Sequence, residues 1–333
     1  MTNREIQKEN GGKNSYPQID ALKGIAIFLV ILGHGIIYFP VDLHQIPACA
    51  SLFGWLSSVH MPLFFVVSGY CFSYRGNYRA FIRKKLRRLA VPYLAFNLLD
   101  LLPRALLPAF FNRPRSFGES LKEIALSGGE FWFLYVLFII FLVYPALYRL
   151  LQRRLPLSLG LFAINLGLYL YLPDDITLFC CSKLVRYLLY FTLGVYVKHF
   201  AGTELFEKQP SSIFSAVAAA AFFGLWIWLL RSHLPCRGDI AALAGILTLY
   251  FCTCFEPVVK AFAPFGRVSL QLYLCNGYAL GVSRTVIVSI LGVTSPAGII
   301  AFNVLVDYFI VYLVVRFVCT RLRPVRFLMG MTE

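Results

Sequence analysis

Long apolar runs recur along almost the whole of this 333-residue chain, and they constrain its fold more than any other feature. A helix needs roughly 20 apolar residues to cross the hydrocarbon core of a bilayer. The fifth, sixth and eighth runs are short or interrupted, so nine or eleven spans would also fit. The chain is expected to be all-α and polytopic, with about ten transmembrane helices near 19–39, 51–74, 89–111, 131–148, 157–172, 176–197, 213–230, 240–255, 268–291 and 297–318.

Composition supports an integral membrane protein whose partner is the lipid bilayer. Hydrophobic residues make up 59% of the chain and charged residues 14%, whereas a soluble domain has about 25% charged residues. The net charge of +15 does not indicate nucleic acid, because Lys and Arg fall in short loops between apolar runs. That placement is typical of residues that set membrane topology.

The loop charges also predict an orientation. If the N-terminus is cytoplasmic, 21 Lys and Arg residues lie in cytoplasmic segments and six in the opposite loops. This bias favours cytoplasmic N- and C-termini. We therefore expect a cytoplasmic tail at 1–18, a transmembrane domain at 19–320 and a cytoplasmic tail at 321–333. The first apolar run is too long for a signal peptide, and no clear internal repeat supports an inverted-repeat transporter.

Ionisable residues within transmembrane spans cost free energy to bury, and they usually mark functional sites. The first span holds Asp20, Lys23 and His34. Lys23 and His34 are separated by three helical turns plus about 20°, so they share one face about 16 Å apart. Lys23 is expected at the cytoplasmic end and His34 in the outer half. Lys23 and His34 thus predict a polar stripe that leads from the cytoplasm to a base within the membrane.

The second span runs back inward and places His60 at a depth similar to that of His34. Pro62 follows and is expected to kink the helix. Beyond it, Ser68 and Gly69 suit a narrow passage approached closely by a ligand. His60 and Ser68 are therefore candidate catalytic residues, together with His34 and Asp20.

The densest basic run of the chain follows the second span, at 83–88. Lys85 and Arg88 form an i,i+3 pair on a helix surface, and with Arg87 they are candidates for holding phosphate groups. Positive-inside anchoring of the loop is the alternative explanation.

Other polar residues within or beside spans are candidates for binding the substrate. Trp132 also suits an interfacial belt, and Arg186 with Asp307 would also suit a structural ion pair. The nine cysteines contain no CxxC pair and no His at ligand spacing, so no metal site is expected. The substrate-binding candidates are Asp100, Trp132, Arg186, Asn276 and Asp307.

Several segments together resemble the acyltransferase 3 family, especially its fucose 4-O-acetylase-like and polysaccharide O-acetyltransferase branch. The chain departs from the family at Asn276, where a His is frequent. The segments that carry the resemblance are Ile19 to His34, Val59 to Tyr70, Lys85 to Leu89 before Pro92, Phe131 to Leu134, Phe191 to Gly194 and Gly266 to Tyr273.

The resemblance implies an O-acyltransferase that moves an acyl group, usually acetyl from acetyl-CoA, to a glycan hydroxyl at the bacterial cytoplasmic membrane. Lys23, Lys85, Arg87 and Arg88 would then hold the phosphates of the donor. His34 would act as general base, because its ordinary pKa is near 6.5. Ser68 or Asn276 would stabilise the oxyanion. Direct transfer and an acyl-histidine intermediate both remain open.

Two other classes of protein fit the same polar path. A transporter or flippase for a glycan-related substrate would move it without covalent change. A scaffold or sensor would use the buried charges only for structure. The two histidines and the phosphate-compatible basic run favour the enzyme.

Overall fold

The structure, a computed structural model, describes residues 16–37, 42–106, 116–173, 176–202, 204–234 and 237–331. This part of the chain is built from helices and contains no strand, so the all-α prediction is confirmed. Each of the ten expected apolar segments overlaps a helix. The main helices are α2 (Pro17–Ile37), α3 (Pro47–Tyr70), α4 (Tyr78–Lys85), α5 (Val91–Leu106), α6 (Phe117–Ser127), α7 (Trp132–Arg153), α8 (Leu155–Tyr171), α9 (Cys181–Ala201), α11 (Ser212–Arg231), α12 (Arg237–Cys252), α13 (Glu256–Gly266), α14 (Ser269–Arg284), α15 (Pro296–Val304) and α17 (Arg323–Leu328).

Short helical pieces complete the chain, and several of them continue a longer helix. The π-helical stretch η2 (Leu86–Ala90) joins α4 to α5, η6 (Thr285–Ile290) extends α14, and η7 (Leu305–Ile310), α16 (Val311–Val314) and η8 (Val315–Cys319) extend α15. The remaining pieces are η1 (Leu43–Gln45), η4 (Gly129–Phe131), η5 (Leu178–Cys180) and α10 (Glu204–Glu207).

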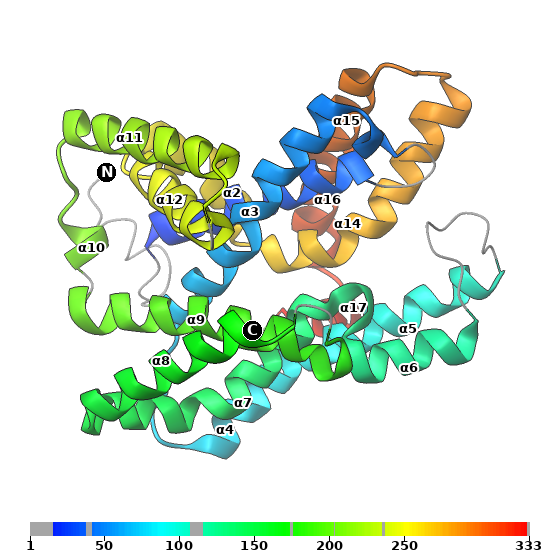
Figure 1. The fold of residues 1–333 in the computed structure, drawn as a ribbon. Coiled ribbons are helices and arrows are strands. Elements are labelled where there is room, and N and C mark those ends of the chain that lie inside the picture. Colours follow the sequence, from blue (N-terminus) through cyan, green and yellow to red (C-terminus); the bar gives the residue numbers. More distant parts are fainter. Residues whose placement is uncertain are drawn as a thin grey trace.

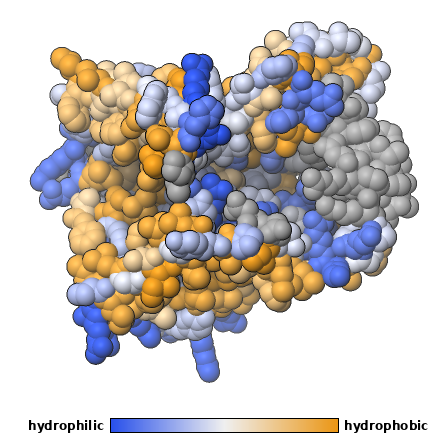
Figure 2. Space-filling model, viewed as in Figure 1, coloured by the Kyte–Doolittle hydropathy of each residue, from blue (hydrophilic) through white to orange (hydrophobic). Residues whose placement is uncertain are grey.

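Six helices in the described residues have the length and composition to cross a membrane, or seven if α12 and α13 form one span broken by a bend of 111°. Apolar side chains cover much of the face in Figure 2, and hydrophilic residues gather in a hollow at its centre. The protein is therefore a multi-pass membrane protein. The count of ten spans and the orientation remain predictions.

Glycines bring two pairs of helices into close contact. A Cβ on Gly69 of α3 would lie 1.9 Å from the carbonyl oxygen of Phe191 in α9, and one on Gly194 would lie 2.0 Å from that of Val66. Gly24 of α2 and Gly266 of α13 meet in the same way, against backbone atoms. Small residues permit such approaches between membrane helices. Gly69 therefore faces α9, which corrects our prediction that it borders a passage approached by a ligand.

The helices α7, α8 and α9 run side by side, with α4 at the edge of the molecule against α7 (Figure 1). An aromatic cluster joins them, in which Phe72 contacts Phe141, Tyr144 and Phe191 at ring-centroid distances of 6.1, 5.1 and 5.8 Å. This packing holds the end of α3 and the basic helix α4 against α7.

Two helices lie where loops were expected. Helix α6 falls in the predicted loop 112–130 and begins with a capping box, in which Ser116 and Glu119 cap each other's backbone. Helix α13 occupies the predicted cytoplasmic loop after α12 and packs on α2. The C-terminal segment, expected as a tail, contains α17, and Met329 after it is buried in the main core.

Candidate active site

A cavity of about 190 Å³ lies between α2, α3, the end of α4, η2, α7 and α14, and we call it the cation-lined cavity. Four residues proposed from the sequence line it: Lys23, Ser68, Lys85 and Arg88. Ser269 and Tyr273 add hydroxyl groups, while aromatic rings form much of the wall. The cavity therefore combines positive charge with an apolar surface.

The close helix crossings explain how distant residues reach this cavity. Lys23 precedes Gly24 at the contact of α2 with α13, and Ser68 precedes Gly69 at the contact of α3 with α9. Each crossing holds its helix in a fixed position, so the neighbouring polar side chain points to one place. Gly24 and Gly69 thus permit close helix packing, and the polar residues that precede them, Lys23 and Ser68, line the cavity.

Lys85 is held against aromatic rings. Its Nζ lies 3.5 Å from the centroid of the Phe141 ring and 5.3 Å from that of Phe81. Burial, together with the nearby charges of Arg88 and Lys84, lowers the pKa of Lys85 to about 7. No carboxylate of the described residues pairs with Lys85 or Arg88. An anion in the cavity would supply the missing negative charge.

Lys23 differs, because its charge is partly balanced. Its Nζ lies 3.4 Å from Oδ1 of Asp20, and Oδ2 of Asp20 lies 3.8 Å from Nε of Arg267 on the other side. Asp20, which contacts both cations, is buried. The structure thus places Asp20 as the partner that orients two cations.

Arg87 lies on a different side of the same basic segment. It is exposed and lines a separate surface concavity with Arg79, Arg83 and Lys84. The structure therefore separates Arg87 from Lys85 and Arg88, with which the sequence grouped it.

His34 and His60 lie outside the cavity lining but close enough to interact electrostatically. Nδ1 of His34 is 2.6 Å from Nδ2 of Asn276, which is buried in α14. Nδ1 of His60 is 2.7 Å from the carbonyl oxygen of Leu56. Because a carbonyl only accepts, Nδ1 of His60 must carry a proton, and its Nε2 is free as an acceptor in the neutral ring.

The indole ring of Trp132 packs against an aromatic ring and a lysine side chain. It stacks with Tyr187 at 5.4 Å, Tyr187 stacks with Phe65 at 4.5 Å, and the Nζ of Lys183 lies 4.3 Å from the Trp132 centroid. This column links the start of α7 to α9 and α3. A substrate that met Trp132 would also meet Lys183.

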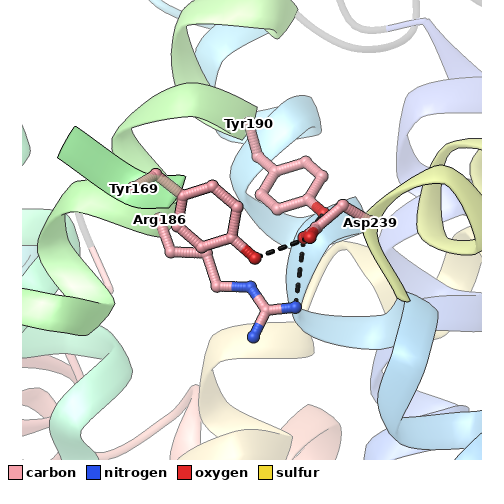
Figure 3. A network of polar contacts seen from close by, with 4 residues as sticks. All are labelled: Tyr169, Arg186, Tyr190 and Asp239. Atoms are coloured by element: carbon pink, nitrogen blue, oxygen red, sulfur yellow. Dashed lines mark hydrogen bonds and ion pairs between the residues drawn. The ribbon is translucent and has the colours of Figure 1, made fainter. Parts of the chain in front are cut away.

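Arg186 belongs to a second charged group, the Asp239 cluster, formed with Tyr169, Tyr190 and Asp239 (Figure 3). Nη2 of Arg186 donates to Oδ1 of Asp239 at 3.1 Å, Tyr190 donates to the same oxygen at 2.7 Å, and Tyr169 donates to Oδ2 at 2.6 Å. The suggested ion pair between Arg186 and Asp307 is therefore wrong. Asp307 instead interacts electrostatically with Arg284 of α14, which is fully buried.

Asp100 is half-buried on α5 and does not line the cavity. Two features of the site were missed in the sequence. Cys71 is exposed and lines the cavity, and Asp239 completes the cluster around Arg186. A carboxylate at the edge of the predicted span 240–255 was the available signal for Asp239.

The fold and the cavity define a helical membrane protein with a cationic site at one end of its bundle. Residues 16–321 match the family model described as an acyltransferase domain, so the chain belongs to the acyltransferase 3 family. The resemblance noted in the sequence is confirmed at this level. No curated protein and no solved structure gives a significant match. The protein is a membrane acyltransferase.

Proposed function

We propose that this acyltransferase moves an acetyl group from acetyl-CoA, bound from the cytoplasm, to a hydroxyl of a cell-surface or lipid-linked glycan in the bacterial cytoplasmic membrane. The observation that carries the proposal is the pair of cations, Lys85 and Arg88, that line a cavity and have no carboxylate partner among the described residues. Phosphate groups are the natural ligands for such a pair.

The cavity wall suits the rest of such a donor. Phe64, Phe133 and Phe141 supply apolar surface beside the cations, which fits the uncharged arm that joins the phosphates to the thioester. Ser68 lies on the same wall and would donate to the developing oxyanion. The donor supplies an activated acyl group, and the protein supplies charge, alignment and a base.

His34 would take the proton of the acceptor hydroxyl as its oxygen attacks the thioester carbonyl. The new C–O bond forms as the C–S bond breaks, and the proton then passes to the thiolate that leaves. This sequence is balanced without an additional reactant. A histidine suits the role of general base in this sequence, because the same ring must accept and then release one proton.

Asn276 controls which nitrogen of His34 accepts that proton. If its amide nitrogen donates to Nδ1, neutral His34 carries its proton on Nε2 and has no free lone pair there. If the amide is turned, Oδ1 accepts from Nδ1–H and leaves Nε2 free as the base. Among the residues that the structure describes, Oδ1 of Asn276 has no hydrogen-bond partner. Asn276 is thus a positioning residue for His34.

The test is acyl transfer in membranes that contain the chain, supplied with acetyl-CoA labelled in its acetyl group. Mass spectrometry of extracted glycans should show the label in ester linkage. His34→Ala should lower the rate at least about 100-fold, which is typical for loss of a general base. His44→Ala is the matched control, because His44 is exposed in η1 and lies outside the cavity lining.

Two outcomes would count against the proposal. Transport of a glycan without any labelled ester would favour a transporter. Substantial transfer by His34→Ala would remove His34 as the base and make His60 the better candidate, since its Nε2 is also free. Label retained on the protein without acceptor would indicate an acyl-histidine intermediate in place of direct transfer.

A further inference from the structure

Helix α4 carries basic residues on two opposite sides, and only one side faces the cation-lined cavity. With about 100° of rotation per residue, Phe81 and Lys85 share the side that packs on α7. Arg79 and Arg83 of α4 and Arg87 of the adjoining η2 follow one another at intervals of four residues on the other side, and we call them the arginine face. They line a concave surface together with Asn77, Tyr78, Ala80, Ile82, Lys84 and Leu86.

Contacts on the inner side hold this helix in place. Phe81 meets Phe72 and Phe141 at centroid distances of 5.7 and 6.0 Å. Asn77 caps the helix by accepting from the backbone N–H of Ala80 at 3.0 Å. The hydroxyl of Tyr78 donates to the carbonyl of Leu142 in α7 at 3.0 Å. The arginine face is therefore presented by a fixed helix.

The three arginines are exposed. None of them makes an ion pair with a carboxylate of the described residues, and exposed Lys84 adds a fourth positive charge at the same concavity. A surface of this kind attracts a phosphate-bearing ligand.

An apolar strip beside the arginines indicates which kind of phosphate-bearing ligand binds there. Tyr78 and Leu86 are 45% and 43% exposed, and half-buried Ile82 lies between them. A soluble phosphate would need only the charges. A helix that lies in a membrane surface needs both an apolar strip for the acyl region and basic residues for the head groups. The position of α4 against α7 and directly before α5 fits that setting.

We infer that the arginine face binds the phosphate head group of an anionic phospholipid, such as phosphatidylglycerol, in the leaflet beside the mouth of the cation-lined cavity. The apolar strip of α4 lies among the acyl chains of that lipid. This inference does not rest on the acyl-transfer reaction, because Lys85 and Arg88 point to the other side of the helix.

The test uses the full-length protein in detergent with phosphatidylglycerol and phosphatidylcholine of identical acyl chains. Native mass spectrometry measures which lipid remains bound. The wild type should retain phosphatidylglycerol at least about tenfold better than phosphatidylcholine. Replacing Arg79, Arg83 and Arg87 by Gln should bring the ratio near one.

A matched variant removes the same charge elsewhere. Arg153, Arg154 and Arg321 are exposed and lie outside α4, so their replacement by Gln should keep the preference. Equal loss in both triple variants, or a preference that survives in the α4 variant, would overturn the inference. Complete displacement of the lipid by glycerol phosphate would also overturn the inference, since the site would then bind a free phosphate compound as well as it binds a lipid.

The wild type alone provides a second measurement, which holds even if the variants fail to fold. Phosphatidylglycerol should raise its thermal unfolding temperature more than phosphatidylcholine does, and the difference should shrink as salt screens the arginines. Equal stabilisation by the two lipids at low salt would contradict a head-group site.

Discussion

The cation-lined cavity and the Asp239 cluster are both groups of charged residues within one helical bundle, yet they are built in opposite ways. In the cluster, Asp239 accepts three hydrogen bonds, from Arg186, Tyr169 and Tyr190 (Figure 3). In the cavity, Lys85 and Arg88 have no carboxylate beside them in the described residues. The carboxylate of Asp239 is paired within the protein, whereas the two cations of the cavity lack a carboxylate in the part of the chain that the structure describes.

This difference separates structural charge from functional charge. Buried polar groups stabilise a fold when their hydrogen bonds are made internally. Charges that lack a partner cost free energy, and they are retained where a ligand neutralises them. Arg186, which we proposed as a substrate-binding residue, thus has a structural partner in α12. Lys85 and Arg88 remain the stronger candidates for binding.

The largest expected effect comes from breaking the complete cluster. Asp239→Ala leaves the Arg186 guanidinium without its carboxylate and two tyrosine hydroxyls without an acceptor. Because both charged side chains are partly exposed, we expect a loss of about 2–3 kcal/mol, measured as a lower thermal unfolding temperature in detergent. Affinity for acetyl-CoA below that temperature should be unchanged. A stable variant with weakened donor binding would reverse the assignment of the two groups.

The next prediction concerns the pH dependence of donor binding. Lys85 has its pKa lowered to about 7 by burial, and the phosphates of a donor would raise it again. Below pH 7 the residue is already charged, so affinity should not vary with its titration. Above pH 7 binding must take up a proton, and affinity should fall up to about tenfold per pH unit.

Lys85→Arg gives the control for this titration, because a guanidinium stays charged throughout. Calorimetric titration with a thioether analogue of acetyl-CoA at pH 7, 8 and 9 measures both proteins. An affinity for the wild type that does not change over this range would show that Lys85 does not contact the donor as a cation.

A smaller effect is expected from the C-terminal segment, which supports the cavity from outside. Gly330 has φ +67°, and a Cβ there would lie 2.6 Å from the carbonyl oxygen of Arg88. Gln271 of α14 also donates to the carbonyl of Met329 at 3.0 Å. Gly330→Ala should shift Arg88 and weaken acetyl-CoA binding about three- to tenfold, because the new Cβ would clash with the Arg88 carbonyl and displace that residue from the cavity, at a cost of about 1 kcal/mol in binding.

Gly292→Ala is the matched control, since Gly292 has φ +65° but open space around it. Both variants carry similar backbone strain, and only the first is placed against Arg88. Equal donor affinity in the two variants would show that the C-terminal segment does not position the site.

The sequence predicted the parts of the fold that depend on local composition. Every expected apolar segment contains a helix, because roughly 20 apolar residues in a row have few alternatives in a membrane. It also selected Lys23, Ser68, Lys85 and Arg88, which meet in one cavity. The sequence singled out these four residues because a polar or charged side chain in or beside a span costs free energy, and their catalytic and binding roles stay predictions.

The parts that failed depend on contacts between distant segments. The partner of Arg186 is Asp239, 53 residues away, and no local pattern identifies such a pairing. The partner of Gly69 is the backbone of α9. The capping box of α6 is readable as Ser116 followed by Glu119, but Arg113-Pro114-Arg115 and Gly128-Gly129 favour a loop over 112–130.

The central claim is that the uncompensated cations of the cavity bind the acyl donor. Two double variants of one basic segment test it, each removing two positive charges. Lys85→Ala with Arg88→Ala changes the cavity, whereas Arg83→Ala with Arg87→Ala changes only the outer surface. The measurement is the affinity of the purified protein for acetyl-CoA in detergent.

The first variant should lose at least about tenfold in affinity, since hydrogen bonds to charged groups contribute about 1.5–3 kcal/mol each. The second should stay within about twofold of the wild type. Unchanged affinity in the first variant, or an equal loss in both, would contradict the account, because the basic segment would then serve topology or general charge and not the donor.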